Sequence, residues 1–152
     1  GKSQFDELHG LTAHNSYILA AAELGFLGYF FWLANLVFTW MMLRRIDALE
    51  PDAKDSSQAA TDWAQVHAAS RALWLGYAGG LVCAFFLSRS YVVVLYLHIA
   101  LVVAVYQMGR HLRSDELPAL RITPYLGRLF TGALFSLLGL WLLTRTLLAF
   151  TG

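Results

Sequence analysis

Residues 24–43 read LGFLGYFFWLANLVFTWMML and contain no charged side chain. Twenty residues of α-helix rise about 30 Å, which matches the thickness of the hydrocarbon core of a bilayer. Asn35 is the strongly polar side chain in the middle of this stretch. The stretch therefore predicts a transmembrane helix, and with it a chain that folds in a membrane.

The composition of the whole chain predicts the same class of protein. Of its 152 residues, 58% are hydrophobic and 14% are charged, whereas a soluble domain carries about 25% charged residues. The net charge is +1 and no run of basic residues is present, so nucleic acid is not an expected partner. Cys83 is the single cysteine and lies in an apolar block, which predicts neither a disulfide framework nor a cysteine metal site.

Outward from residues 24–43, the sequence predicts an all-α polytopic membrane protein with about four transmembrane helices. The four-span bundle is expected over residues 17–152, with spans at about residues 17–43, 69–87, 91–108 and 129–150. Residues 1–16 are expected to end a loop outside the membrane. Residues 59–70 are predicted to form a helix that lies at the membrane interface, with Trp63, Val66 and Ser70 on one face.

The basic residues predict the orientation of this bundle. The connections after the first and third spans share one side of the membrane and carry eight basic residues, whereas the opposite side carries three. Because basic residues are enriched in cytoplasmic loops, we expect both long connections in the cytoplasm and both termini outside. The eight are Arg44, Arg45, Lys54, Arg71, Arg110, Arg113, Arg121 and Arg128, and the three are Lys2, Arg89 and Arg145.

The start of the chain is polar. Residues 1–15 lack the basic and then apolar layout of a signal peptide, and the first methionine is Met41. We therefore expect the chain to be the C-terminal portion of a longer protein.

A polar pair, His14-Asn15, lies directly before the first predicted span. The neutral imidazole of His14 can take a proton from a hydroxyl near pH 7, which makes general base the natural role. Considered alone, a loop histidine is more often an ordinary surface residue. Asn15 can orient a sugar or a carbonyl, or it can cap the helix that follows. His9 and His14 lack a third ligand, so no metal site is predicted.

The surroundings of His14 change this reading. His14-Asn15, nine further residues and then Gly25-x-x-Gly28 resemble the signature of the O-antigen ligase and polymerase superfamily. In that signature a His followed by Asn, Ser or Gln precedes Gly-x-x-Gly by nine residues, and Thr commonly follows. Here Tyr29 stands at the position of that Thr. The resemblance is specific over residues 13–30.

The resemblance implies a glycosyltransferase of the bacterial inner membrane, of the kind used in lipopolysaccharide biosynthesis. Such an enzyme moves a glycan from an undecaprenyl-diphosphate carrier to a hydroxyl of a glycan, lipid or protein acceptor, without a metal ion or other cofactor. His14 would be the base that activates the acceptor, on the periplasmic side. The family neutralises the diphosphate with arginines upstream of this motif. Lys2 is the basic residue that precedes His14 here, so we expect this chain to hold one half of an active site.

The remaining polar and small residues have two readings each. Asn15 and Glu23 are candidate substrate-binding residues, although Glu23 can also hold an arginine elsewhere in the full protein or be a solvated helix end. Gly25 and Gly28 are predicted to allow close helix packing, with substrate contact as the alternative. His98 lies midway along the third span, where an ionisable group is a functional candidate. A neutral histidine hydrogen-bonded to a neighbouring helix is the preferred reading.

A second function remains open from the sequence. The chain can be a non-catalytic membrane subunit that retains a remnant of the ligase family and packs against other membrane subunits of a larger complex. The intact His-Asn and Gly-x-x-Gly spacing favours the enzyme. The residue at position 29 and the lack of arginine before His14 favour the subunit.

Overall fold

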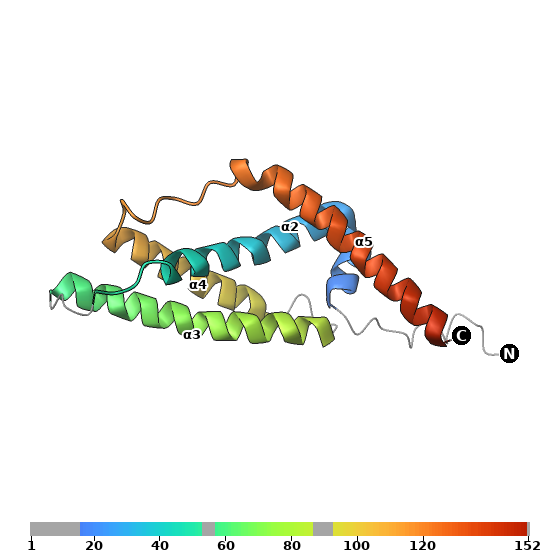
Figure 1. Ribbon diagram of the computed structural model, residues 1–152, viewed down its shortest axis with the longest axis horizontal. Coiled ribbons are helices and arrows are strands. Elements are labelled where there is room, and N and C mark those ends of the chain that lie inside the picture. Colours follow the sequence, from blue (N-terminus) through green and yellow to red (C-terminus); the bar gives the residue numbers. More distant parts are fainter. Residues whose placement is uncertain (1–15, 53–56, 87–92, 152) are drawn as a thin grey trace.

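The structure of the protein, a computed structural model, describes residues 16–52, 57–86 and 93–151. These residues form helices and no strand, so the predicted all-α class is confirmed (Figure 1). The elements are α2 (Ser16–Asp47), α3 (Gln58–Phe86), α4 (Val93–Leu112), the 3-10 helix η1 (Thr123–Tyr125) and α5 (Leu126–Thr151).

Three helical segments of the described chain are long and apolar enough to cross a membrane. They are Ala20–Asp47, Val93–Leu112 and Thr123–Leu143. The chain is therefore a helical membrane protein by the length and composition of its helices. α3 has 29 residues but is not one of the three, and its first half carries Asp62 and Arg71. A fourth span through α3 stays a prediction.

The helix expected at the membrane interface is instead the first half of α3. α3 runs without interruption from Gln58 to Phe86, because residues 58–75 contain no proline or glycine that would end a helix. Trp63, Val66 and Ser70 do share a face, but all three are buried. Trp63 and Val66 pack in a cluster with Ile46, Tyr106 and Leu117. This face therefore covers other helices rather than the surface of the bilayer.

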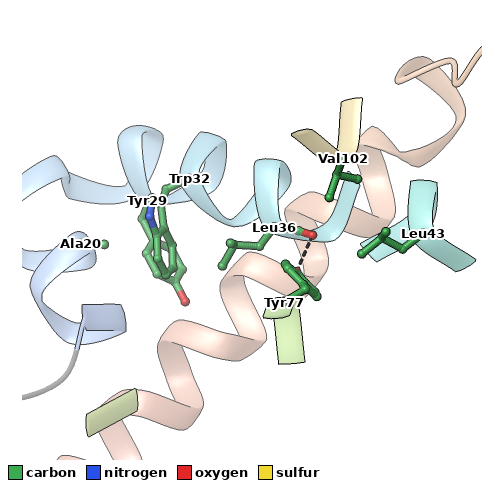
Figure 2. Close-up of a cluster of buried hydrophobic side chains, with 7 residues drawn as sticks. All are labelled: Ala20, Tyr29, Trp32, Leu36, Leu43, Tyr77 and Val102. Carbon is green, nitrogen blue, oxygen red and sulfur yellow. Dashed lines mark hydrogen bonds between the residues drawn. The ribbon is translucent and has the colours of Figure 1, made fainter. Parts of the chain in front are cut away.

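The main core lies where α2, α3 and α4 meet. These three helices pack against one another, whereas α5 packs only on α2 among the described α-helices and diverges from the bundle (Figure 1). In the core, the hydroxyl of Tyr77 on α3 donates to the carbonyl oxygen of Leu36 on α2 at 2.6 Å. The buried side chains of this cluster, shown in Figure 2, are Ala20, Tyr29, Trp32, Leu36, Leu43, Tyr77 and Val102.

A set of hydrogen bonds ties the connection before α5 to the other helices. The guanidinium of Arg45 donates to the hydroxyl of Tyr106 and to the carbonyl oxygen of Pro118, both at 3.3 Å. It also lies 3.5 Å from the hydroxyl of Tyr125 in η1. Nearby, the guanidinium of Arg113 lies 4.6 Å from the centre of the Trp63 ring. The C-terminal ends of α2 and α4 and the start of α3 lie together (Figure 1), at the end predicted to face the cytoplasm.

The outer faces of α4 and α5 are apolar and exposed. Such faces would be an aggregation hazard in water, whereas in a bilayer they lie against hydrocarbon or against further helices. On α4 the exposed apolar side chains include Val93, Val94, Leu97, Leu101 and Met108, and on α5 they include Phe130, Leu134, Phe135, Leu138, Trp141 and Leu142.

Candidate functional site

The described part of the motif lies in the first half of α2. His14 and Asn15 lie outside the described residues, so their predicted roles are not tested by the structure. α2 begins at Ser16, the residue after this pair. Glu23, Gly25 and Gly28 are on α2 and can be placed.

Gly25 interrupts α2 with a backbone conformation that other residues rarely adopt. Its φ is 62° and its ψ is −172°, a region that is essentially restricted to glycine. A Cβ atom added at Gly25 would have nothing within 4 Å, so the local space does not require glycine there. The backbone does, because a side chain at this φ and ψ would be strained.

The interruption divides α2 into two arms, and the sequence had predicted one continuous span over residues 17–43. We call residues 16–24 the N-terminal arm and residues 26–47 the long arm. The ribbon of α2 turns sharply at its blue end, and the N-terminal arm leaves the axis of the long arm (Figure 1). A straight helix could not make this turn, so the glycine conformation gives the motif its shape.

Contacts across the bend show that the N-terminal arm folds back on the long arm. The rings of Tyr17 and Trp32 pack edge to face with centroids 5.3 Å apart. Trp32 follows Tyr17 by fifteen residues, and fifteen residues of straight helix rise about 22 Å. Ala20 is fully buried in the same cluster as Tyr29 and Trp32. In Figure 2, Ala20 lies on the N-terminal arm, whereas Tyr29 and Trp32 lie on the long arm.

Gly28, in the first turn of the long arm, lies against the end of the N-terminal arm. A Cβ atom added at Gly28 would overlap the side chain of Leu24, the last residue of the N-terminal arm. The sequence had predicted close helix packing at Gly25 and Gly28. At Gly28 the described neighbour is the arm of the same helix, and at Gly25 the glycine serves the turn itself.

The folded arm also reaches α3. The hydroxyl of Tyr17 lies 3.4 Å from the carbonyl oxygen of Leu81, to which it donates. Leu81 is near the C-terminal end of α3. Glu23 is exposed, two residues before the bend, so its carboxylate is available to solvent or to a ligand. The N-terminal arm is thus held at two places, by Trp32 on α2 and by the end of α3.

Sequence reasoning did not find Tyr17, Tyr29 and Trp32 as parts of this arrangement. A signal was present in their spacing, because Tyr17 and Trp32 are nearly equidistant from Gly25, as are Ala20 and Tyr29. Such a pattern is expected when a helix folds back at a central residue. This spacing can be interpreted as a fold-back only once Gly25 is known to break the helix. Glycines spaced as in Gly-x-x-Gly are equally typical of packed membrane helices.

Asn35 and His98, the polar residues expected in the middle of their spans, lie away from this bend. Asn35 donates to the carbonyl oxygen of Phe31, four residues earlier in its own helix, at 3.1 Å. The His98 ring stacks on Tyr77 with centroids 6.2 Å apart, and its Cε1 would lie 3.1 Å from a Cβ added at Gly76. Its Nε2 atom is buried and has no hydrogen-bond partner among the described residues. The hydrogen bond to a neighbouring helix expected for His98 is therefore absent at Nε2.

A separate hollow lies between α3 and α4, near the end predicted to face the cytoplasm. Its volume is about 650 Å³, and Asp62, Gln65, Val66, Ala69, Val105, Gln107, Met108, His111 and Leu112 line it. Among the described motif residues, Glu23, Gly25 and Gly28 do not line it. Within the described ranges, no group of three His, Cys, Asp or Glu side chains is placed to hold a metal ion.

Comparison with known proteins gives no relative for this chain. No family model, no curated protein and no solved structure matches it. Its function is therefore inferred from its own residues and from their arrangement.

Proposed function

We propose that this chain is the C-terminal part of a bacterial inner-membrane glycosyltransferase of the O-antigen ligase type. It transfers a glycan from an undecaprenyl-diphosphate carrier to an acceptor hydroxyl. The observation that carries the proposal is the His14-Asn15 pair followed, after nine residues, by Gly25-x-x-Gly28. The backbone conformation of Gly25 and the crowding at Gly28 support it, because both positions favour glycine, as the Gly-x-x-Gly part of the signature has it.

The chemistry follows from the residue types. The imidazole of His14 accepts the proton of the acceptor hydroxyl, and the resulting oxygen nucleophile attacks the anomeric carbon of the donor sugar. The bond between that carbon and the diphosphate oxygen breaks, and undecaprenyl diphosphate leaves with the electron pair. The imidazolium then gives its proton to water. Asn15 and Glu23 are proposed to hydrogen-bond the glycan, and Glu23 is exposed as this role requires.

The membrane assignment supports the same activity. A polyprenyl carrier keeps its chain in the hydrocarbon and its charged diphosphate at the surface, since burying charge in an apolar medium is costly. A protein with three apolar helices long enough to cross a membrane can meet such a donor laterally. We propose four spans with both termini in the periplasm, which places the motif on the side where His14 is expected.

The test is His14→Ala in the full-length protein, expressed in cells that lack the wild-type copy. We expect glycan transfer to stop and undecaprenyl-diphosphate-linked glycan to accumulate, as measured by mass spectrometry of extracted membrane lipids. His9→Ala is the matched control, because His9 is a second histidine five residues earlier. Normal expression of both variants, with normal transfer in His14→Ala, would exclude the proposal.

A second function, that of a non-catalytic membrane subunit, is favoured by the charges of the described residues. On the side proposed to be periplasmic, Arg145 is the described basic residue, and its guanidinium lies 5.1 Å from the centre of the Trp141 ring. A donor diphosphate needs cationic neutralisation when it leaves. If purified full-length protein lacks transfer but copurifies with a membrane partner that restores it, the subunit function is supported.

A further inference from the structure

The hollow between α3 and α4 follows the line along which these two helices pack. Gly76 of α3 lies against the ring of His98 on α4, since a Cβ atom added there would be 3.1 Å from the Cε1 of His98. Further along the same line, a Cβ atom added at Gly109 of α4 would be 3.3 Å from the ring of Trp63 on α3. The two helices are therefore antiparallel, and the hollow between them can be placed along their axes.

The hollow has a deep end and an outer end. Ala69 and Val105 are each seven residues from the contact between the α3 glycine and the α4 histidine, so they are level with each other, and both line the hollow. Asp62 and Leu112 are seven residues further on and also line it. Leu112 is the last residue of the helix Val93–Leu112, which is long and apolar enough to cross a membrane. Seven residues of helix rise about 10 Å, so the hollow reaches from the end of this span to about 10 Å inside it.

The side chains that line the hollow become less polar with depth. Asp62 and His111 lie near the outer end, whereas Ala69 and Val105 line the deep end. The volume of about 650 Å³ is within the range of about 300–1,000 Å³ that is usual for ligand pockets. Such a gradient suits an amphiphile with its hydrocarbon chain at the deep end and its polar head at the outer end, because burial in an apolar site stabilises apolar groups and is costly for polar ones. The exposed lining residues, which leave the hollow open to the surroundings of the bundle, are Gln65, Gln107, Met108, His111 and Leu112.

Asp62 gives the outer end of the hollow a negative charge. Its Oδ1 accepts a hydrogen bond from the side-chain amide of Gln58 at 2.7 Å, which leaves the charge in place. Among the described residues no basic side chain forms an ion pair with Asp62, and the ion pair found there joins Arg113 and Glu116. Because Asp62 is half-buried, its unpaired carboxylate favours a cationic partner that donates hydrogen bonds. A protonated primary amine is such a partner.

A positive charge lies beside the hollow. The guanidinium of Arg110 donates to the side-chain carbonyl oxygen of Gln107, a lining residue, at 2.9 Å. The Nε atom of Arg110 is buried and has no hydrogen-bond partner in the part of the chain that the structure describes. A guanidinium pairs well with a phosphate. The hollow thus has an anionic and a cationic side chain near its polar rim, which matches a zwitterionic head. An apolar helix seated there would leave both charges without partners, at a cost in free energy.

We propose that the hollow binds one phospholipid of the surrounding bilayer, with a head that carries a phosphate and a primary ammonium group, as in phosphatidylethanolamine. The ammonium group donates to Asp62, the phosphate lies beside Arg110, and part of one acyl chain fills the deep end beside Ala69 and Val105. This site is separate from the motif, and the inference does not rest on the proposed function.

The test is native mass spectrometry of the full-length protein released from nanodiscs. The nanodiscs contain equal amounts of phosphatidylethanolamine, phosphatidylcholine and phosphatidylglycerol with the same acyl chains. A choline head has no N–H donor, and a glycerol head has no positive charge. We expect one phosphatidylethanolamine to stay bound, with a preference of about tenfold over either other lipid, as one charge-assisted hydrogen bond can provide. Equal retention of the three lipids, or a preference for phosphatidylglycerol, would overturn the proposal. So would the absence of retained lipid, which is the result expected if another helix of the full-length protein fills the hollow.

Two pairs of variants locate the bound lipid. Asp62→Asn keeps the shape of the side chain and should abolish the preference for phosphatidylethanolamine over phosphatidylcholine. Asp115→Asn changes an exposed carboxylate that does not line the hollow and should keep the preference. Ala69→Phe fills the deep end and should remove the retained lipid, whereas Ala68→Phe adds the same ring at the exposed neighbouring position and should not. Wild-type retention in Ala69→Phe, or an unchanged preference in Asp62→Asn, would show that the lipid is bound elsewhere.

Photo-crosslinking of the wild-type protein gives an answer that does not depend on the folding of a variant. Full-length protein in phosphatidylcholine bilayers receives a trace of phosphatidylethanolamine with a diazirine on one acyl chain, and the labelled residues are identified by peptide mass spectrometry. Met108 lines the hollow, and Phe135 is an exposed apolar residue of α5 outside it. We expect Met108 to be labelled more than Phe135, and an excess of unlabelled phosphatidylethanolamine to suppress the labelling of Met108 alone. Equal labelling and equal suppression at both residues would mean that the hollow is only part of the general lipid contact.

Discussion

The hydroxyl of Tyr29 lies 3.0 Å from the Oγ of Ser136, which is 107 residues later in the chain. The Oγ of Ser136 donates to the carbonyl oxygen of Ala133 in its own helix at 2.9 Å. Because a serine hydroxyl has one hydrogen, Tyr29 is the donor in the bond between α2 and α5. Tyr29 itself is fully buried, so the residue at the position of the signature's Thr joins the motif to α5 by a hydrogen bond, beside the ring contacts of Phe26 and Phe30 with Phe130.

Tyr29→Phe should therefore destabilise the contact between α2 and α5. The loss of one buried hydrogen bond costs about 1 kcal/mol, and the Oγ of Ser136 still donates to the carbonyl oxygen of Ala133. We expect Tyr29→Phe and Ser136→Ala to lower the free energy of unfolding by similar amounts. The double variant should lose little more than either single variant, as measured by unfolding in detergent micelles.

Thr131→Ala is the control for this pair. Thr131 is exposed on α5 and donates to the carbonyl oxygen of Gly127 within the same helix, so its loss should not couple to Tyr29. Strictly additive effects of Tyr29→Phe and Ser136→Ala would show that the two hydroxyls do not interact.

Gly25→Ala should oppose the bend in α2. A side chain at φ 62° and ψ −172° costs about 1–3 kcal/mol in backbone strain, and a straight helix relieves that strain by giving up the contact between Tyr17 and Trp32. We expect a lower midpoint of thermal unfolding and a longer distance between spin labels attached to the N-terminal arm and to the long arm.

The matched control for this substitution is Gly79→Ala. Gly79 lies in regular helix in α3, and a Cβ atom there would have nothing within 4 Å. Alanine is more favourable than glycine in a helix by about 0.5–1 kcal/mol, so Gly79→Ala should be neutral or stabilising. Equal effects of the two substitutions would contradict the special role of Gly25.

Gly28→Ala should also disturb the bend, for a steric reason rather than a conformational one. The added Cβ atom would overlap Leu24, so the arms must separate or the Leu24 side chain must move. We expect a loss of about 1–3 kcal/mol, the usual cost of overpacking. Shortening the neighbour in Gly28→Ala/Leu24→Ala should recover part of this loss, as measured by the same unfolding experiment. No recovery in the double variant would mean that Leu24 is not the obstacle.

The fold class was predictable from sequence because the membrane leaves the backbone few choices. In hydrocarbon every backbone polar group must be paired within the protein, so long apolar stretches become helices. Residues 24–43 predicted the long arm of α2 on this basis. The helix α4 covers residues 93–108 of the stretch expected at about 91–108, and α5 covers the stretch expected at about 129–150. The surroundings of the first half of α3 were harder to predict, because its apolar face can pack equally well on a lipid surface or on other helices.

The shape of the motif was not predictable from the same rules. Gly25 is compatible with a straight helix, where it allows close packing, and with a break, where it allows a positive φ. The choice depends on contacts between residues far apart along the helix, such as Tyr17 with Trp32. Local propensity carries no information on those contacts. The predicted roles of His14, Asn15 and Glu23 depend on a donor and an acceptor, and they stay predictions.

Arg44 and Arg45 are neighbours at the end of α2 with different surroundings, so substitutions at the two positions should have different effects. Arg45 donates to Tyr106, Pro118 and Tyr125, whereas Arg44 is exposed and its guanidinium lies 5.9 Å from the centre of the Trp40 ring. Arg45→Met should release the connection before α5 and cost about 1 kcal/mol.

Arg44→Met keeps these contacts and should leave stability nearly unchanged, since exposed surface substitutions usually change it by less than about 0.5 kcal/mol. Limited proteolysis tests the local effect, because residues 113–122 are the described connection between α4 and η1. In Arg45→Met this connection should be cleaved faster than in Arg44→Met or the wild type. Both variants lose one positive charge on the same side of the membrane, so a difference between them reports the hydrogen bonds of Arg45 and not the charge. Equal cleavage rates in the two variants would show that Arg45 does not hold the connection to α5 in place.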